Sequence, residues 1–337
     1  MQKTLLNRDR HTRFIIIACI LISVLPTTLV AQQPALKPID PKSIDLTKPT
    51  LFIVPYSHLD DIWRWSYPQT IRDFLKNTLD ENFAAFEVYP HFVFNWSGAS
   101  RYAMMREYYP ERYEKLKQWV AAGRWFPSGS SWVENDVNVP STESIIRQIL
   151  LGSKYIHNEF GTQSLEYMLP DCFGFPYSLP SVLNHCGLRG FSTQKLTWKS
   201  ANGIPFNVGR WIGPDGKSVI AALNAGNYSA AHKDVYTTHD KTLKRLEENR
   251  QRSGLPIDLF YMGGGDRNNA DRGGSPQKVS LETLEKCYAT EGPVRVIAGP
   301  ADLMVRAITD EQAEKFPTWS RDLLLIGRKD GMVIALD

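Results

Sequence analysis

Short apolar runs alternate with longer amphipathic segments along most of the chain. The runs predict strands at 51–56, 91–96, 165–169, 190–194 and 257–262. Apolar positions at helical spacing predict helices at about 69–87, 99–122, 141–159, 177–186, 239–254 and 277–290. The stretch "VGRWIGPDGKSVIAAL" is typical of a hairpin that turns at "GPDG". Strands that alternate with helices predict an α/β fold with a mainly parallel sheet or an irregular (β/α) barrel.

The N-terminal segment has the pattern of a secretory signal. A basic stretch, "MQKTLLNRDRHTR", precedes the apolar run "FIIIACILISVLPTTLV". We expect cleavage after Ala31 and export to the periplasm or the exterior, without a stable membrane partner afterwards. An uncleaved anchor and lipid attachment at Cys19 are the alternatives. Residues 32–50, rich in proline and polar residues, are predicted to be a linker, and 51–325 a folded α/β domain.

Composition narrows the function little. The 337 residues carry a net charge of +3 and are 42% hydrophobic, which is ordinary for a globular protein. There is no polybasic run, so nothing indicates nucleic-acid binding. Beyond Cys19, the cysteines are Cys172, Cys186 and Cys287, with no CxxC spacing, and they are expected to be buried free thiols. Function must therefore come from local groups of residues.

Candidate metal ligands follow the first predicted strand, in "SHLDDIW". On an extended segment, His58 and Asp60 point to the same side, so both can reach one ion. Imidazole and carboxylate ligands suit zinc, and also cobalt or manganese. The alternative is a solvated turn that caps the next helix. Trp63 either stacks on the apolar face of a sugar or belongs to a helix core.

Two further acidic motifs follow strands. Asp171 in "LPDCFG" comes after 165–169 and either binds metal, attacks an electrophilic carbon or caps a helix. "GGGD" follows 257–262. Because ligands bind at the carboxyl ends of parallel strands, we expect these carboxylates to converge with "SHLD" in one pocket. The long segment "RWFPSGSSWVENDVNVPSTES" adds Trp125 and Trp132, aromatics that suit a sugar-binding rim.

The glycine-rich loop "GGGDRNNADRGGSP" supplies Asp266 and Asp271. It is not a phosphate cradle, because no GK[ST] follows and the loop is acidic. A general acid on a turn, or less favourably a calcium site, remains. One nucleophilic and one acid/base carboxylate would satisfy the requirement for retaining glycoside cleavage.

Taken together, the motifs resemble glycoside hydrolase family 38, the α-mannosidases. They run in order as "SHLDDIWRW", "GRWFPSGSSWVENDVNVPSTESIIRQILLG", "YMLPDCFGFPYSLPSVLNHCG", "FSTQKLTW", "FYMGGGD" and "FPTWSRDLLL". The resemblance covers nearly all of 51–325. It implies hydrolysis of α-mannosidic linkages in a mannose-containing glycan, with a zinc cofactor.

The resemblance also implies roles for single residues. His58 and Asp60 match two zinc ligands, and Asp171 matches the nucleophile, which also binds the metal. Trp63 matches an aromatic beneath the mannose, and Lys195 a basic residue close to the site.

The acid/base residue of the family is matched in part by two positions. Asp266 is favoured because it directly follows a strand, and Asp271 is the alternate. The two catalytic carboxyl groups of a retaining enzyme are expected to lie about 5–5.5 Å apart.

The tail 326–337, "IGRKDGMVIALD", departs from the family, and the family's remaining zinc ligand, a histidine, has no match here. We therefore expect a truncated catalytic domain with weak zinc binding and low or absent activity. A non-catalytic carbohydrate-binding protein is one alternative. A polysaccharide deacetylase is less favoured, because it needs two histidines four positions apart, a spacing that this sequence lacks.

Overall fold

The computed structural model describes residues 36–264 and 272–325, within one compact unit that spans 34–337. The predicted signal segment with Cys19 and the tail 326–337 lie outside the described residues. Asp266 and Asp271 also lie outside them, in the gap between Gly264, the last residue of a strand, and Arg272. Their roles therefore stay predictions.

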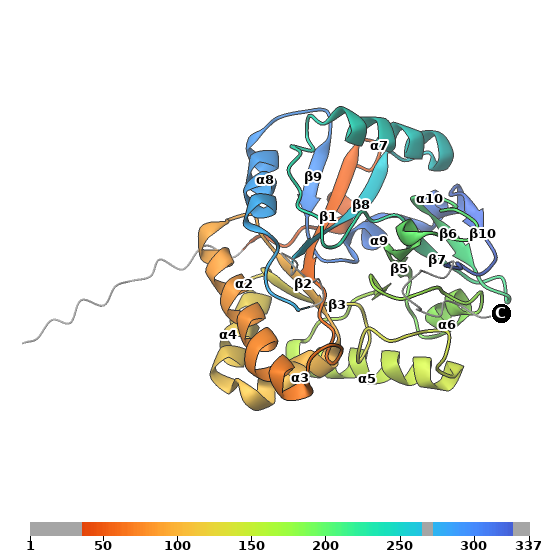
Figure 1. The fold of residues 1–337 in the computed structure, drawn as a ribbon. Coiled ribbons are helices and arrows are strands. Elements are labelled where there is room, and N and C mark those ends of the chain that lie inside the picture. The colour runs from red at the N-terminus through yellow and green to blue at the C-terminus, as the bar shows by residue number, and fades with distance from the viewer. Residues whose placement is uncertain (1–35, 265–271, 326–337) are drawn as a thin grey trace, which may run out of the picture. The chain divides into compact units, whose positions relative to one another are not determined.

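The first sheet is entirely parallel and has β1 at its centre (Figure 1). Its strands are β1 (Thr50–Ser57), β2 (Phe94–Ser97), β3 (Trp125–Ser128), β8 (Ile257–Gly264) and β9 (Arg295–Ala298). Strand β8 pairs with β1 along its whole length, whereas β9 and β2 share the opposite edge, β9 at its start and β2 at its end. The carboxyl ends of β1 and β8 therefore lie side by side.

The second sheet has the order β10-β6-β7-β5-β4. Its strands are β4 (Glu166–Met168), β5 (Gly190–Ser192), β6 (Val208–Ile212), β7 (Ser218–Ala222) and β10 (Thr318–Trp319). Only the hairpin β6–β7 is antiparallel, as its turn predicted. The amide of Tyr261 in β8 donates to the carbonyl of Ala225, 2.9 Å away, and so links the first sheet to the segment that follows β7. The predicted α/β fold with mainly parallel strands is confirmed; among the described residues the strands form two sheets and no closed barrel.

Helices cover the outer faces of the sheets. They are α1 (Tyr67–Gln69), α2 (Lys76–Val88), α3 (Ala99–Tyr108), α4 (Pro110–Ala121), α5 (Thr142–Phe160), α6 (Leu179–His185), α7 (Asp240–Ser253), α8 (Lys278–Ala289), α9 (Leu303–Ala307) and α10 (Asp310–Glu314). A π-helical turn, η2 (Thr70–Leu75), joins α1 to α2, and two 3₁₀ turns are η1 (Pro41–Ser43) and η3 (Lys195–Trp198). Apolar side chains of both sheets meet in a core that includes Tyr56, Met168 and Tyr261.

Several segments differ from the sequence predictions. The single helix predicted at 99–122 is two helices, because Tyr109 before Pro110 adopts φ −136° and ψ 55°, outside the helical region. Residues 125–128, predicted as part of a long loop, form β3. Strand β9 was not predicted. The edge position of β3 tolerates Pro127, which has no amide to donate.

The segment before β1 also differs from the predicted linker. Ile44 and Leu46 are 8% and 3% exposed and lie in the core between the sheets. The amide of Leu36 donates to the carbonyl of Ala122 at 3.2 Å. Residues 36–50 are therefore part of the folded unit.

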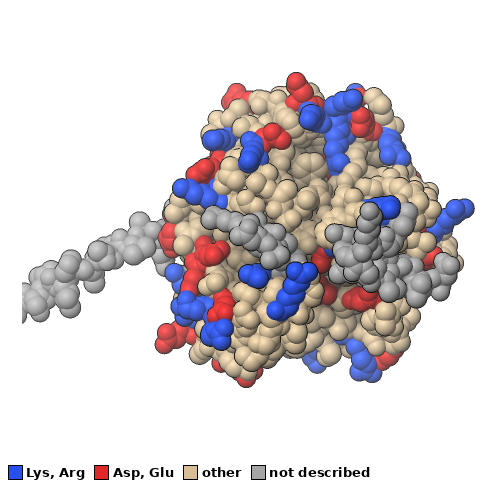
Figure 2. Space-filling model, viewed as in Figure 1, with Lys and Arg blue, Asp and Glu red and all other residues tan. Residues whose placement is uncertain are grey.

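The described thiols are free, with Cys172 and Cys287 buried and Cys186 half-buried. In the described ranges, no helix combines the length and apolarity that a membrane span needs. On the face seen in Figure 2, lysine and arginine side chains are interspersed with aspartate and glutamate. This mixture agrees with the near-neutral net charge.

Candidate active site

Two segments that leave strands bring three metal-binding side chains together. His58 directly follows β1, and Asp171 follows β4 after a short turn. Nε2 of His58 lies 3.3 Å from Oδ1 of Asp60 and 3.5 Å from Oδ2 of Asp171. His58 is buried, while the Asp60 and Asp171 side chains are 32% and 14% exposed. The structure thus gathers the three residues predicted as ligands at one partly open point.

The donor set fits a divalent cation. One atom from each of the three residues lies within 4.8 Å of the other two. Two ligands held tetrahedrally about 2.0–2.2 Å from zinc are roughly 3.3–3.6 Å apart, which agrees with both histidine–carboxylate distances. The imidazole nitrogen and two carboxylate oxygens are ligands that zinc accepts. In the part of the chain that the structure describes, no second group of three such residues comes together.

A buried carboxylate lies on the other side of the His58 ring. Oε2 of Glu134 is 2.6 Å from Nδ1 of His58, and the Glu134 side chain is 4% exposed. Its Oε1 accepts from the Ser97 hydroxyl and lies 3.3 Å from a guanidinium nitrogen of Arg101. Arg101 also binds Asp61, with Nε 3.1 Å from Oδ1.

This cluster shifts the acid–base behaviour of both partners. Burial disfavours the carboxylate, but the charges of His58 and Arg101 outweigh it and lower the pKa of Glu134 to about 2. Burial also disfavours imidazolium, yet Glu134 and the ligand carboxylates outweigh it and raise the pKa of His58 well above its usual range. Without a cation, the structure therefore favours a protonated His58 at neutral pH.

The second oxygen of Asp171 faces a different pair of side chains. Oδ1 accepts from the ammonium of Lys195 and from the hydroxyl of Tyr228, the latter at 3.1 Å. The Lys195 side chain is 1% exposed, and its Nζ lies 3.3 Å from the centre of the Trp198 ring. Asp171 is consequently held in one orientation, with one oxygen toward His58 and the other toward Lys195.

The three predicted aromatic contacts lie in different environments. Trp63 is 42% exposed, beside the ligand segment, with the Arg64 guanidinium 4.1 Å above its ring. Trp132 is partly buried and packs edge-on against Tyr155 of α5. Trp125 is fully buried, 4.7 Å from the Phe94 ring. A fully buried indole cannot stack on a sugar, so the rim predicted for Trp125 is replaced by a core position.

The segment that follows the undescribed glycine-rich loop is fixed next to the ligands. The amide of Gly273 donates to the carbonyl of His58 at 2.8 Å, and Arg272 forms a β-bridge with Leu59. Gly274 N and Ser275 N donate to side chains of α2, at 2.8 Å and 2.9 Å. Residues 272–275 therefore lie beside the candidate metal ligands.

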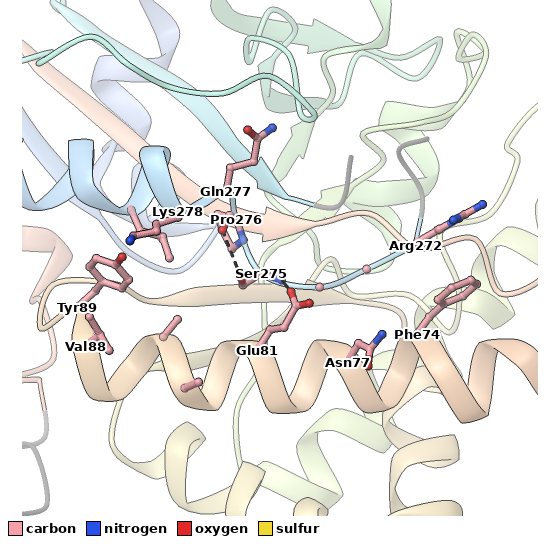
Figure 3. Close-up of a pocket in the computed structure, with 15 residues that line it drawn as sticks. Phe74, Asn77, Glu81, Val88, Tyr89, Arg272, Ser275, Pro276, Gln277 and Lys278 are labelled. Atoms are coloured by element: carbon pink, nitrogen blue, oxygen red, sulfur yellow. Dashed lines mark hydrogen bonds between the residues drawn. The ribbon is translucent and has the colours of Figure 1, made fainter. Parts of the chain in front are cut away.

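A groove of about 760 Å³ lies between α2 and residues 272–278 (Figure 3). Glu81 stands in it below Ser275, and Lys278 and Gln277 line the opposite side. None of the three candidate ligands lines this groove. This groove is thus separate from the candidate metal centre.

Residues 48–322 match the glycosyl hydrolases family 38 N-terminal domain. The match covers most of the chain and includes every described residue of the candidate site. The chain belongs to this family. The resemblance inferred from the sequence motifs is therefore confirmed.

Curated relatives in this family are considerably longer than the chain. It is 30% identical over 277 residues to human "Alpha-mannosidase 2C1", covering 82% of this chain and 26% of the relative. It is 34% identical over 247 residues to "Alpha-mannosidase G" of Dictyostelium discoideum, covering 72% of this chain and 21% of the relative. The chain thus spans about a quarter of their length.

A solved structure supports the fold of the family 38 domain. The crystal structure of an alpha-mannosidase from Enterococcus faecalis V583 superimposes with a TM-score of 0.64 at 20% identity. The match covers 82% of this chain and 31% of that one. At this identity the similarity speaks for the fold alone.

Sequence reasoning missed several residues that surround the family 38 site. Glu134 was noted within its segment but not as a partner of His58, and Arg101, Ser97 and Tyr228 were not singled out. Ser97 directly follows the strand predicted at 91–96, so the strand-end rule could have found it. Arg101 adjoins Tyr102 on the buried face of α3, where a charged residue requires a partner. Tyr228 lies in a segment without a comparable signal.

Proposed function

We propose that this family 38 chain carries the active site of a retaining, metal-dependent α-mannosidase that cleaves α-mannosidic linkages in glycans. The position of Asp171 is the observation that carries the proposal. One of its oxygens faces His58 and Asp60, the other contacts Lys195 and Tyr228, and the side chain remains partly exposed. The printed names of the curated relatives, which are alpha-mannosidases, support the substrate class.

His58, Asp60 and Asp171 would hold the cation, for which zinc is our candidate. Bound there, a divalent cation supplies Lewis-acid coordination of sugar hydroxyl groups. Trp63, exposed next to the ligands, would offer its indole face to the apolar side of the ring. These groups would orient the mannose above Asp171, which is the positioning that nucleophilic attack requires.

Asp171 would act as the nucleophile. Its carboxylate oxygen forms a bond to the anomeric carbon while the bond to the leaving oxygen breaks. The leaving oxygen takes a proton from the general acid, predicted to be Asp266 or alternatively Asp271. Water, deprotonated by the same residue, then releases mannose with its configuration retained and restores Asp171. Lys195 and Tyr228 would keep Asp171 in position between turnovers.

An aryl α-mannoside assay on the full chain tests the proposal. We expect turnover that a chelator abolishes and added zinc restores, with α-mannose as the first product. Asp171→Asn should lower kcat at least about a thousandfold, because it removes the nucleophile. Asp310→Asn is a matched control, since that side chain is 94% exposed, and it should retain activity.

Two outcomes would contradict the proposal. Binding of mannosides without turnover, unchanged in Asp171→Asn, would indicate a non-catalytic carbohydrate-binding protein. Release of acetate from acetylated polysaccharide, without release of mannose, would indicate a deacetylase. Product analysis separates these outcomes from slow mannosidase activity.

A further inference from the structure

Glu134 contacts the candidate ligand His58 at the ring nitrogen that does not face the other ligands. Nδ1 lies 2.6 Å from Glu134, whereas Nε2 lies 3.3 Å and 3.5 Å from Asp60 and Asp171. A neutral imidazole carries its proton on one nitrogen and leaves the other as the metal-binding lone pair. The partner of Nδ1 therefore decides whether Nε2 can bind a cation.

We propose that Glu134 is a positioning residue that fixes the His58 ring with Nε2 available to the metal. The inference rests on the proposed metal site, but it concerns this chain's own hydrogen bonds. An ionised carboxylate only accepts, so Nδ1 must donate to it and Nε2 keeps its lone pair. Carboxylates that bind the second nitrogen of a histidine ligand typically change metal affinity about 10–100-fold when they are removed.

The surroundings of Glu134 leave it little freedom. Its Oε1 accepts from Ser97 at the end of β2 and from Arg101 of α3. The Arg101 side chain is 3% exposed and also donates to the carbonyls of Ser97 and Leu59. Because three elements hold the carboxylate, the Oε2 that meets His58 cannot rotate away without breaking these bonds.

Asn135, the residue after Glu134, contacts the segment that carries the candidate ligand Asp171. The thiol of Cys172, adjacent to Asp171, donates to the carbonyl of Asn135 at 3.1 Å. The Asn135 side chain accepts from the hydroxyl of Tyr167 in the segment of β4, at 2.5 Å. Glu134 thus contacts the segment after β1, and Asn135 contacts the segment after β4. Two consecutive residues of one loop therefore hold the two segments that carry the candidate ligands.

Glu134→Gln distinguishes a positioning role of Glu134 from a purely structural one. Arg101 can only donate, so the amide oxygen of the glutamine should face it and the NH₂ group should face His58. Nδ1 would then have to accept, and the proton would move to Nε2, where it blocks the cation. We expect zinc affinity, measured by chelator competition on the full chain, to fall about 10–100-fold. Glu134→Ala, which imposes no tautomer, should lose no more than the glutamine variant.

Asp61→Asn is the matched control, because Asp61 is the other carboxylate on Arg101. It also removes one negative charge from the cluster, but it leaves the partner of His58 Nδ1 in place, so its loss of zinc affinity should be clearly smaller than the loss of about 10–100-fold expected at Glu134. Equal losses in Asp61→Asn and Glu134→Gln would overturn the proposal, as would wild-type affinity in Glu134→Gln. An alanine variant much weaker than the glutamine variant would indicate that Glu134 only fills space.

Nuclear magnetic resonance of ¹⁵N-histidine-labelled protein supplies an arm that needs no bound cation. We expect the His58 proton on Nδ1 in wild type and on Nε2 in Glu134→Gln, under alkaline conditions in which the ring is neutral. The same tautomer in both proteins would overturn the inference. If wild type binds no zinc, the metal-dependent function fails, while this tautomer comparison still decides the role of Glu134.

Discussion

Replacing His232 should reduce the loss of the free energy of unfolding that the chain shows as the pH falls below about 7. His232 is 7% exposed, and its Nδ1 contacts the hydroxyl of Tyr236. Burial lowers the pKa of His232 to about 4, and a hydrogen bond with the backbone of Tyr261 and the charge of Asp234 oppose this only in part. In the unfolded chain the pKa of this histidine is about 6.5, so between pH 6.5 and 4 the unfolded chain binds a proton that the folded chain does not.

The sign and size follow from these two values. The neutral ring contributes its full stability above pH 6.5, and this contribution is lost as pH falls toward the folded pKa of about 4. A pKa difference of about 2.5 corresponds to about 3.4 kcal/mol in total. By pH 5, about 2 kcal/mol of the free energy of unfolding should already be lost through this one residue.

Urea unfolding at several pH values between 7.5 and 4 measures the effect. The His232→Asn side chain stays neutral and can still bond Tyr236, so its lost packing shifts the curve by an amount independent of pH. Other titrating groups are common to both proteins and cancel in the difference. The wild-type and variant curves should therefore converge by about 2 kcal/mol between pH 7.5 and 5. Parallel curves would refute the reasoning.

Two further substitutions test the packing around the site. Gly273→Ala places a Cβ 2.4 Å from Oγ1 of Thr78. It should therefore destabilise the chain by about 1–3 kcal/mol more than Gly216→Ala, because Gly216 has a similar positive φ but open space around it. Equal melting temperatures of the two variants would contradict this. Trp125→Ala should cost about 3–5 kcal/mol in urea unfolding because the indole is in the core, whereas Trp63→Ala should cost less than about 1 kcal/mol and instead raise KM for mannosides; a large stability loss at Trp63 would contradict its exposed placement.

The strand-end pattern explains why much of the site could be predicted. His58 and Asp171 both follow strands whose short apolar runs are plain in the sequence, and ligands bind at the carboxyl ends of parallel strands. This rule pointed to both residues although β1 and β4 lie in different sheets. The spacing of His58 and Asp60 on an extended segment then placed both side chains on one side. Local sequence sufficed because each step depended on neighbours within a few positions.

Long-range packing accounts for what the sequence did not reveal. The segment around Trp125 is rich in glycine, serine and proline, which is typical of a loop, yet β2 supplies its backbone partners and makes it a strand. Glu134 meets a histidine 76 positions earlier in the chain. Helix spacing put Arg101 among apolar neighbours without identifying its carboxylate partners. Such pairings depend on how β1, β3 and α3 come together, and no local pattern encodes that.

Charge balance ties these buried pairs to the proposed cation. Among the described residues that contact one another here, the carboxylates are Asp60, Asp61, Glu134 and Asp171, and the permanent cations are Arg101 and Lys195. With a neutral His58 the group therefore carries two uncompensated negative charges, in a place where several of the side chains are nearly excluded from water. A proton on His58 removes one of them, which accounts for its raised pKa. A divalent cation balances both negative charges and leaves His58 neutral, as a ligand should be. The charge of the cluster is therefore matched by a divalent cation and only half matched by a proton.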